Sequence, residues 1–264
     1  MKLPQNLSFH PKLAAAFEVI FGAIFIWWLG LIGAWWILFV WAGFRLLFWA
    51  VLVRLVSYPT EVNRWHHFVS LFFFGLGALS FILFVEWGWT VWLLRLAFVF
   101  GPALSFWLVP VKGNELSFVL KPYRRWQFLS CVFGLAGIWS GVYAVLSLQI
   151  FNINRWWWFL SATVLSALLA GWWWKEYGIL RDKKFLLWQI VLGIIFLETA
   201  WAISLWPLGF FINGLLLSWF WYVLWLLGRF QLSKLGVNWK KQTPFLIINF
   251  VLLILFLLLI ARWK

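Results

Sequence analysis

Long apolar runs alternate with short polar, glycine- or proline-containing breaks along the whole chain. A helix that crosses a membrane needs about 20 apolar residues. The first run, 13–56, would form a single helix of about 66 Å at about 1.5 Å per residue, so we expect it to fold back near Gly30. We expect the second overlong run, 185–229, to be split at Pro207, which lacks an N–H group. The pattern therefore predicts an all-α, polytopic integral membrane bundle.

Divided in this way, the chain contains about nine predicted transmembrane helices. Their expected positions are 13–31, 34–55, 66–86, 89–110, 127–149, 156–174, 185–205, 208–229 and 245–262. No low-complexity linker or shift in composition marks a boundary between domains. We therefore expect one transmembrane domain over residues 1–264.

The composition agrees with this class of protein. The chain is 66% hydrophobic and 11% charged, whereas a soluble domain is about half apolar and about a quarter charged. It is also rich in tryptophan, with 27 in all, many of them near the ends of predicted spans, as in the aromatic belts of membrane proteins. Trp41 and Trp225 lie deeper, so their indole N–H groups need buried acceptors.

The net charge of +14 indicates anionic headgroups as partners rather than nucleic acid, because the basic residues lie in the connections between apolar runs. Assigning alternate connections to opposite sides places most of the 21 Lys and Arg residues on one side. The positive-inside rule then predicts a cytoplasmic N-terminus and an outside C-terminus, in a plasma membrane of the bacterial type.

Four ionisable residues fall well inside predicted spans, with Glu86 at an outer end, and each charge costs about 2.5–3.5 kcal/mol at the centre of the bilayer. They are Glu18, Arg45, Arg95 and Glu198. Counted from the span ends, Glu18 and Arg45 lie within reach of each other in the inner half, and Arg95 and Glu198 share a depth in the outer half. We expect two opposite-charge pairs. They either fix neighbouring helices or line a substrate or proton path, unless each side chain instead extends to the interface without a partner.

The longest polar interruption, 112–126, holds the densest cationic turn. The candidate headgroup-binding residues there are Lys121, Tyr123, Arg124, Arg125 and Trp126. Guanidinium groups bind phosphate well, which favours a clamp for a substrate or lipid headgroup, with the two aromatic rings at headgroup height. Alternatively, the turn only anchors the topology, as basic residues do in any inner loop. The segment before it could form a short strand or a helix lying along the membrane surface.

Small residues repeat at helical spacing in the fifth and sixth predicted spans. One face of each span carries such a set: Gly134, Gly137 and Gly141 in one, and Ala162, Ser166 and Ala170 in the other. Small residues let helices approach closely in lipid, so we predict a tightly packed hairpin of these two spans.

Catalytic and metal chemistry find little support. His66 and His67 are adjacent, so on a helix they point about 100° apart and do not form a bidentate metal site, and we interpret them as a polar cap at the interface. Ser140 has no histidine at its depth to act as a base. We expect no metal and no cofactor, and we lean against an enzyme.

For function, the sequence favours a non-catalytic membrane scaffold or assembly component that meets other membrane proteins or a second copy of itself. The alternatives are a transporter or flippase-like carrier of an anionic or lipid-linked substrate, and a membrane enzyme acting on lipid-linked phosphates. A polar cavity would distinguish the alternatives from the scaffold. We expect few polar residues to line one, and for this reason the sequence favours the scaffold.

Overall fold

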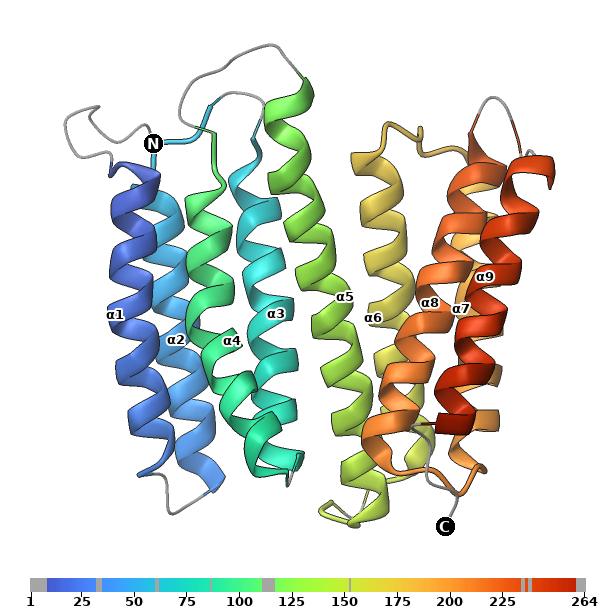
Figure 1. The fold of residues 1–264 in the computed structure, drawn as a ribbon, viewed down its shortest axis with the longest axis horizontal. Helices are drawn as coiled ribbons and strands as arrows, with labels where there is room; N and C mark the ends of the chain where they lie inside the picture. Colours follow the sequence, from blue (N-terminus) through green and yellow to red (C-terminus); the bar gives the residue numbers. More distant parts are fainter. Residues whose placement is uncertain are drawn as a thin grey trace. The chain divides into compact units, whose positions relative to one another are not determined.

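The computed structural model describes residues 9–31, 35–59, 62–85, 87–110, 117–151, 153–233, 236 and 239–259. Within these ranges the regular elements are nine helices, joined by short connections (Figure 1). They are α1 (Pro11–Leu29), α2 (Trp35–Leu55), α3 (Arg64–Phe84), α4 (Gly88–Trp107), α5 (Ser117–Ser147), α6 (Arg155–Glu176), α7 (Lys183–Ser204), α8 (Phe210–Leu232) and α9 (Trp239–Leu259). The predicted all-helical fold is confirmed.

Seven of the described helices are long and apolar enough to cross a membrane. The other two are α6 and α9. Two tryptophan triplets, 156–158 and 172–174, lie near the two ends of α6 and lower its mean hydropathy. Tryptophan is nevertheless favoured at the membrane interface. In α9 the apolar segment is shorter, Gln242–Leu258. The number of helices that cross the membrane, and their direction, stay predictions.

Seven helices begin within two residues of their predicted positions, and α9 begins six residues earlier than predicted. The start of α5 differs more. It begins at Ser117 rather than at 127, so the expected basic loop is wrong in its second half: residues 117–126 are helical and continuous with the span. With 31 residues, α5 is about 46 Å long, against a hydrocarbon core of about 30 Å. If α5 crosses the membrane, its basic first turns therefore extend beyond that core.

Asparagine or aspartate side chains cap the N-termini of three of the helices. Asn63 and Asn154 accept hydrogen bonds from the backbone N–H groups of Trp65 and Trp156, at 2.9 and 3.1 Å. Asp182 likewise accepts from the N–H of Phe185 at 2.7 Å. Such caps satisfy N–H groups that the first turn of a helix leaves free, and they fix where α3, α6 and α7 begin.

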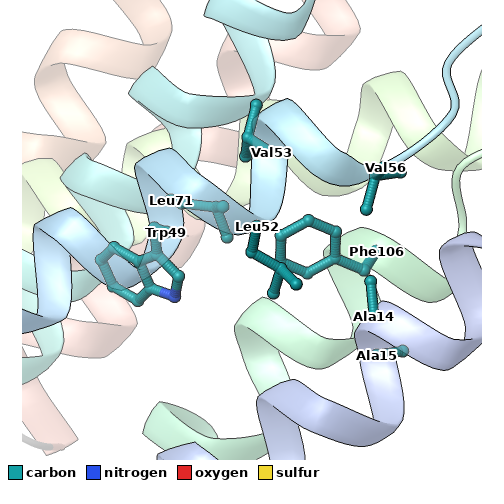
Figure 2. Close-up of a cluster of buried hydrophobic side chains, with 8 residues drawn as sticks. All are labelled: Ala14, Ala15, Trp49, Leu52, Val53, Val56, Leu71 and Phe106. Atoms are coloured by element: carbon teal, nitrogen blue, oxygen red, sulfur yellow. The ribbon is translucent and has the colours of Figure 1, made fainter. Parts of the chain in front are cut away.

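The chain divides into two compact units, Met1–Leu135 and Ala136–Lys264, and the boundary falls within α5. In the first unit, α1 to α4 form a closed ring in which each helix contacts the next and α1 contacts α4. Figure 2 shows part of the core. It comprises Ala14 and Ala15 of α1, Trp49, Leu52 and Val53 of α2, Val56 just after α2, Leu71 of α3 and Phe106 of α4.

The part of α5 that belongs to the first unit lies against α3 at an unusually close approach. A Cβ atom on Gly77 would overlap the backbone of Gly134, and a Cβ on Gly134 would overlap the carbonyl of Phe73. The predicted small-residue face is therefore wrong at Gly134, which packs on α3 and not on α6. Gly137 and Gly141 are buried further along α5.

In the second unit, the C-terminal half of α5 packs with α6, α7 and α8. Tryptophan and tyrosine donors tie these helices together: the hydroxyl of Tyr143 donates to the carbonyl of Ala200 at 2.8 Å, and the indole of Trp221 donates to the carbonyl of Ser166 at 2.9 Å. A further indole, that of Trp219 in α8, donates to Asn249 in α9 at 3.0 Å. Much of the rest of α9 is exposed, as expected of a helix at the edge of a bundle.

Candidate functional site

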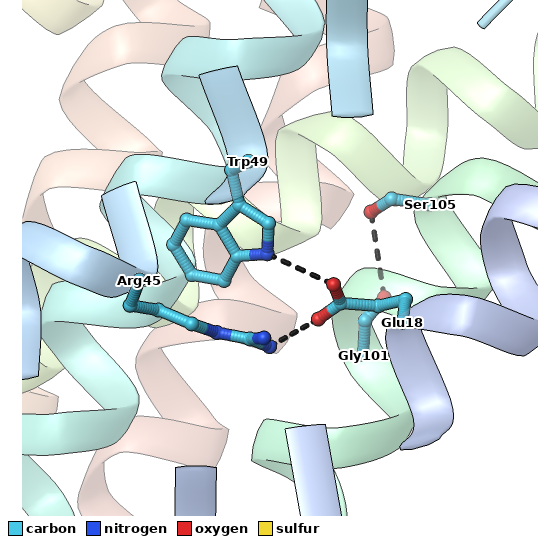
Figure 3. A network of polar contacts seen from close by, with 5 residues as sticks. All are labelled: Glu18, Arg45, Trp49, Gly101 and Ser105. Atoms are coloured by element: carbon cyan, nitrogen blue, oxygen red, sulfur yellow. Dashed lines mark hydrogen bonds and ion pairs between the residues drawn. The ribbon is translucent and has the colours of Figure 1, made fainter. Parts of the chain in front are cut away.

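The first predicted charge pair is present inside the first unit. Figure 3 shows the Arg45 guanidinium of α2 with one Nη atom on the carboxylate of Glu18 in α1. The other carboxylate oxygen accepts a hydrogen bond from the indole of Trp49, at 3.1 Å, one helical turn after Arg45. Both charged side chains are buried, with 2% of Arg45 and none of Glu18 exposed. The spacing of Arg45 and Trp49 thus places two donors on one carboxylate.

Aromatic rings enclose the rest of the guanidinium. Its central carbon lies 4.6 Å from the ring centre of Trp49, 4.9 Å from that of Phe25 and 5.1 Å from that of Phe98. The Nε and second Nη atoms have no hydrogen-bond partner among the described residues, so cation–π attraction takes the place of hydrogen bonds there. Gly22 has no side chain, and a Cβ atom added there would lie 3.6 Å from an Nη atom of Arg45. This pair is closed to a substrate and acts as a clamp between α1 and α2.

The second predicted pair is not brought together by any described contact. Arg95 of α4 is half-buried, and its guanidinium carbon lies 5.5 Å from the ring centre of Trp92, one turn nearer the start of the helix. Glu198 is exposed on α7. The two residues belong to different units, so their pairing stays a prediction.

The candidate headgroup residues divide into two sets. Tyr123 is buried against Val62 and Val109, and the indole of Trp126 donates to the hydroxyl of Ser105 at 2.8 Å. These two rings hold α5 against its neighbours, and their position at headgroup height stays a prediction. Arg124 and Arg125 are exposed. The side chain of Lys121 and residues 112–116 lie outside the described part of the chain.

His67 is buried and does not form the expected interfacial cap. Its Nδ1 atom is 2.9 Å from the hydroxyl of Tyr58, which lies in the connection between α2 and α3. The rings of Phe106 and Tyr123 pack against the imidazole, with centres 4.6 and 5.6 Å away. This contact links α3, α4, α5 and the α2–α3 connection at one end of the first unit. It is a packing contact, although the Nε2 atom has no partner among the described residues.

One of the small residues of α6, Ser166, accepts hydrogen bonds from tryptophan. The indole of Trp139 in α5 donates to the hydroxyl of Ser166 at 3.1 Å. The ring of the same tryptophan stacks near Phe159, with centres 6.4 Å apart. Ala162 and Ala170 are buried on the same helix. A tryptophan of α5 therefore contacts the small-residue face of α6, while the predicted close approach of the two backbones stays a prediction.

A cavity of about 720 Å³ lies within the second unit, where α5 and α7 end and α6 and α8 begin. Buried Tyr143 and Asn213 contribute to its lining, together with Ser147, Gln149 and Arg155. Gln149 has a positive φ of 49° just beyond the end of α5, a position where glycine is usual. The expectation that few polar residues could line a cavity is therefore wrong.

The sequence pattern did not reveal these lining residues because the ends of four helices and the two connections between them supply them. Only Arg155 carried a signal, as one of the few basic residues on its side of the predicted bundle. Asn213 stands in an apolar run, where its polarity was the available clue.

Comparison with protein-family models, with curated proteins and with solved structures found no match for this chain.

Proposed function

We propose that this chain is a multi-pass protein of a bacterial-type cytoplasmic membrane that acts as a non-catalytic scaffold or assembly component. In this proposal all nine helices cross the membrane and the N-terminus lies inside. The ends of the helices support the orientation: Arg54 and Arg64 flank the α2–α3 connection, and Lys175 and Lys183 flank the α6–α7 connection. On the opposite side, Arg155 is the described basic residue at a helix end. This asymmetry follows the positive-inside rule.

The observation that carries the assembly role is the exposed carboxylate of Glu198. It lies six residues before the end of α7, about 9 Å inside a helix that is apolar enough to span a membrane. Among the described residues of the second unit, no cation forms an ion pair with it. A carboxylate in hydrocarbon is costly, so this face of α7 is stable in a membrane when a donor or cation covers it. A protein partner, a second copy or Arg95 would supply one.

Native mass spectrometry of the gently extracted protein tests the assembly role. We expect the wild type to retain a stoichiometric protein partner or a second copy, and Glu198→Gln to lose it. Thr199→Val is the matched control, because this neighbouring polar side chain bonds within its own helix, to the carbonyl of Ile195. A wild type that is monomeric and free of protein partners would contradict the proposal.

Labelling with a membrane-impermeant maleimide tests the orientation separately. In a Cys131→Ala background, we expect Leu148→Cys, between α5 and α6, to react in intact cells. Arg181→Cys, between α6 and α7, should react only after the membrane is opened. The reverse pattern would invert the proposed topology.

A carrier of an anionic or lipid-linked substrate is the second candidate. The polar lining of the cavity in the second unit favours it, since a carrier needs such a site and a pure scaffold does not. Transport of a substrate across reconstituted vesicles would establish this role over that of a scaffold.

A further inference from the structure

We propose that the cavity of the second unit binds a phosphate ester that carries a neighbouring hydroxyl group, with the phosphate at Arg155 and the hydroxyl at Asn213. This inference goes beyond the assembly role, because it assigns a ligand to a site that assembly does not require. It claims binding and not transport.

Asn213 supplies the acceptor. Its side chain is only 5% exposed, and the amide N–H₂ group faces the carbonyl of Leu208, at 3.5 Å. A carbonyl can only accept, so this contact fixes which end of the amide is the nitrogen. The amide oxygen is buried and has no hydrogen-bond partner among the described residues. A buried acceptor left unpaired lowers stability, so a ligand with an O–H or N–H donor would relieve that cost.

Arg155 supplies the cation. It is the only charged side chain among the described residues that line the cavity, and it is exposed at the first position of α6. The lining also includes the beginning of α8, where Asn213 lies in the first turns. The C-terminal ends of α5 and α7 line the cavity as well, and their negative dipole ends offset the positive ends of α6 and α8. The preference for an anion therefore rests on Arg155 and on a described lining without a carboxylate.

The lack of a carboxylate in the described lining also favours a hydroxyl over an ammonium as the hydrogen-bond donor of the ligand. A buried ammonium would lose its hydration and find only neutral acceptors there, whereas a hydroxyl needs no charged partner. Tyr143 adds a second neutral acceptor, since its hydroxyl hydrogen is directed to the carbonyl of Ala200. The site therefore favours a hydroxylated phosphate ester over a phosphoethanolamine.

The size and rim of the cavity fit a glycerophosphate headgroup or a soluble ester of that kind. About 720 Å³ lies within the range of about 300–1,000 Å³ typical of small-molecule sites. Exposed Phe151, Ile153 and Trp206 stand among the lining residues and would contact the apolar part of a lipid. The two sources share the same headgroup chemistry, and the experiment separates them.

The test is native mass spectrometry of the purified full chain with equal amounts of phosphatidylglycerol and phosphatidylethanolamine, and with soluble glycerol phosphate in a separate arm. We expect the wild type to retain phosphatidylglycerol about tenfold better than phosphatidylethanolamine. Arg155→Gln should abolish that preference. Binding in the glycerol phosphate arm alone would assign the site to a free ester and exclude a lipid. Equal retention of both lipids, with no binding of glycerol phosphate, would overturn the proposal.

Two further variants locate the site. Asn213→Leu should still bind the anionic lipid but lose the discrimination between hydroxyl and ammonium headgroups. Arg124→Ala/Arg125→Ala removes two exposed cations of the first unit and should leave the preference unchanged. If that double variant loses the preference and Arg155→Gln keeps it, the site lies at the start of α5 and the proposal is wrong. Arg155 is exposed, so its replacement decides the question even if Asn213→Leu fails to fold.

Discussion

Gly77 of α3 and Gly134 of α5 face each other so closely that a Cβ atom on Gly77 would overlap the backbone of Gly134. No flexible side chain stands between them that could move aside. Helices in lipid gain stability from such close packing, because the surrounding acyl chains are as apolar as the side chains. This contact joins the part of α5 that belongs to the first unit to the ring formed by α1 to α4.

Gly77→Ala should therefore destabilise the protein, although alanine is the better helix former. Overpacking a tight site costs about 1–3 kcal/mol, more than the about 1 kcal/mol that alanine gains over glycine in a helix. Gly43→Ala in α2 is the control, since a Cβ there would meet nothing within 4 Å. Thermal unfolding in detergent should show a lower midpoint for Gly77→Ala and an equal or higher one for Gly43→Ala. Equal midpoints for both variants would refute the close approach.

The Glu18–Arg45 pair predicts strong coupling between two substitutions. Glu18→Gln leaves a buried guanidinium without its counter-charge, and Arg45→Met leaves a buried carboxylate with only the indole of Trp49. Breaking a buried pair from one side costs about 3–5 kcal/mol, whereas replacing both partners is often close to neutral. The double variant should thus be more stable than either single variant, as measured by thermal unfolding. Additive losses would show that the charges act independently.

Tyr58 predicts a loss of stability at high pH. Burial raises the pKa of its hydroxyl above the usual value near 10, against a smaller opposite effect of Arg64. The folded state then keeps a proton that the unfolded chain releases. This contribution to stability is complete below about pH 10 and declines as the pH rises further.

Tyr58→Phe should flatten this decline, although it also removes the contact with Nδ1 of His67 and lowers stability at neutral pH. Unfolding midpoints between pH 8 and pH 11, measured for both proteins, provide the check. Parallel curves for the two proteins would assign the decline to other groups.

The apolar runs predicted the helices well because the length of a span and the need to satisfy its backbone groups constrain them strongly. Depth along the helices was also enough to match Glu18 with Arg45, since both lie on neighbouring helices in the chain. The contacts of Gly134 and Tyr123 were not predictable in this way. Small and aromatic residues indicate that one face of a helix is packed, but they do not indicate which neighbouring helix packs on that face.

The polar cavity illustrates a second limit. Its lining comes from the ends of four helices, and no single segment has a composition that stands out. The start of α5 was not predictable for a related reason: Pro122 and the basic residues around it are typical of a loop, yet α5 continues through Pro122, its sixth residue. Packing of Tyr123 and Trp126 then holds these turns in place.

Arg95 and Glu198 allow the assembly role to be distinguished from pairing within the chain. If the two side chains pair, Glu198→Gln should destabilise the protein and Arg95→Met should restore much of the loss, because the double variant leaves no unpaired charge. If a separate protein covers Glu198, Arg95→Met should not rescue Glu198→Gln, and the partner seen in the wild type should be absent from both Glu198 variants. Thermal unfolding and native mass spectrometry on the same four proteins separate these outcomes. Two results together would remove the main support for assembly. They are that Arg95→Met restores the stability of Glu198→Gln, and that the wild type carries no protein partner. The Glu198 carboxylate would then be fully explained by pairing within one chain.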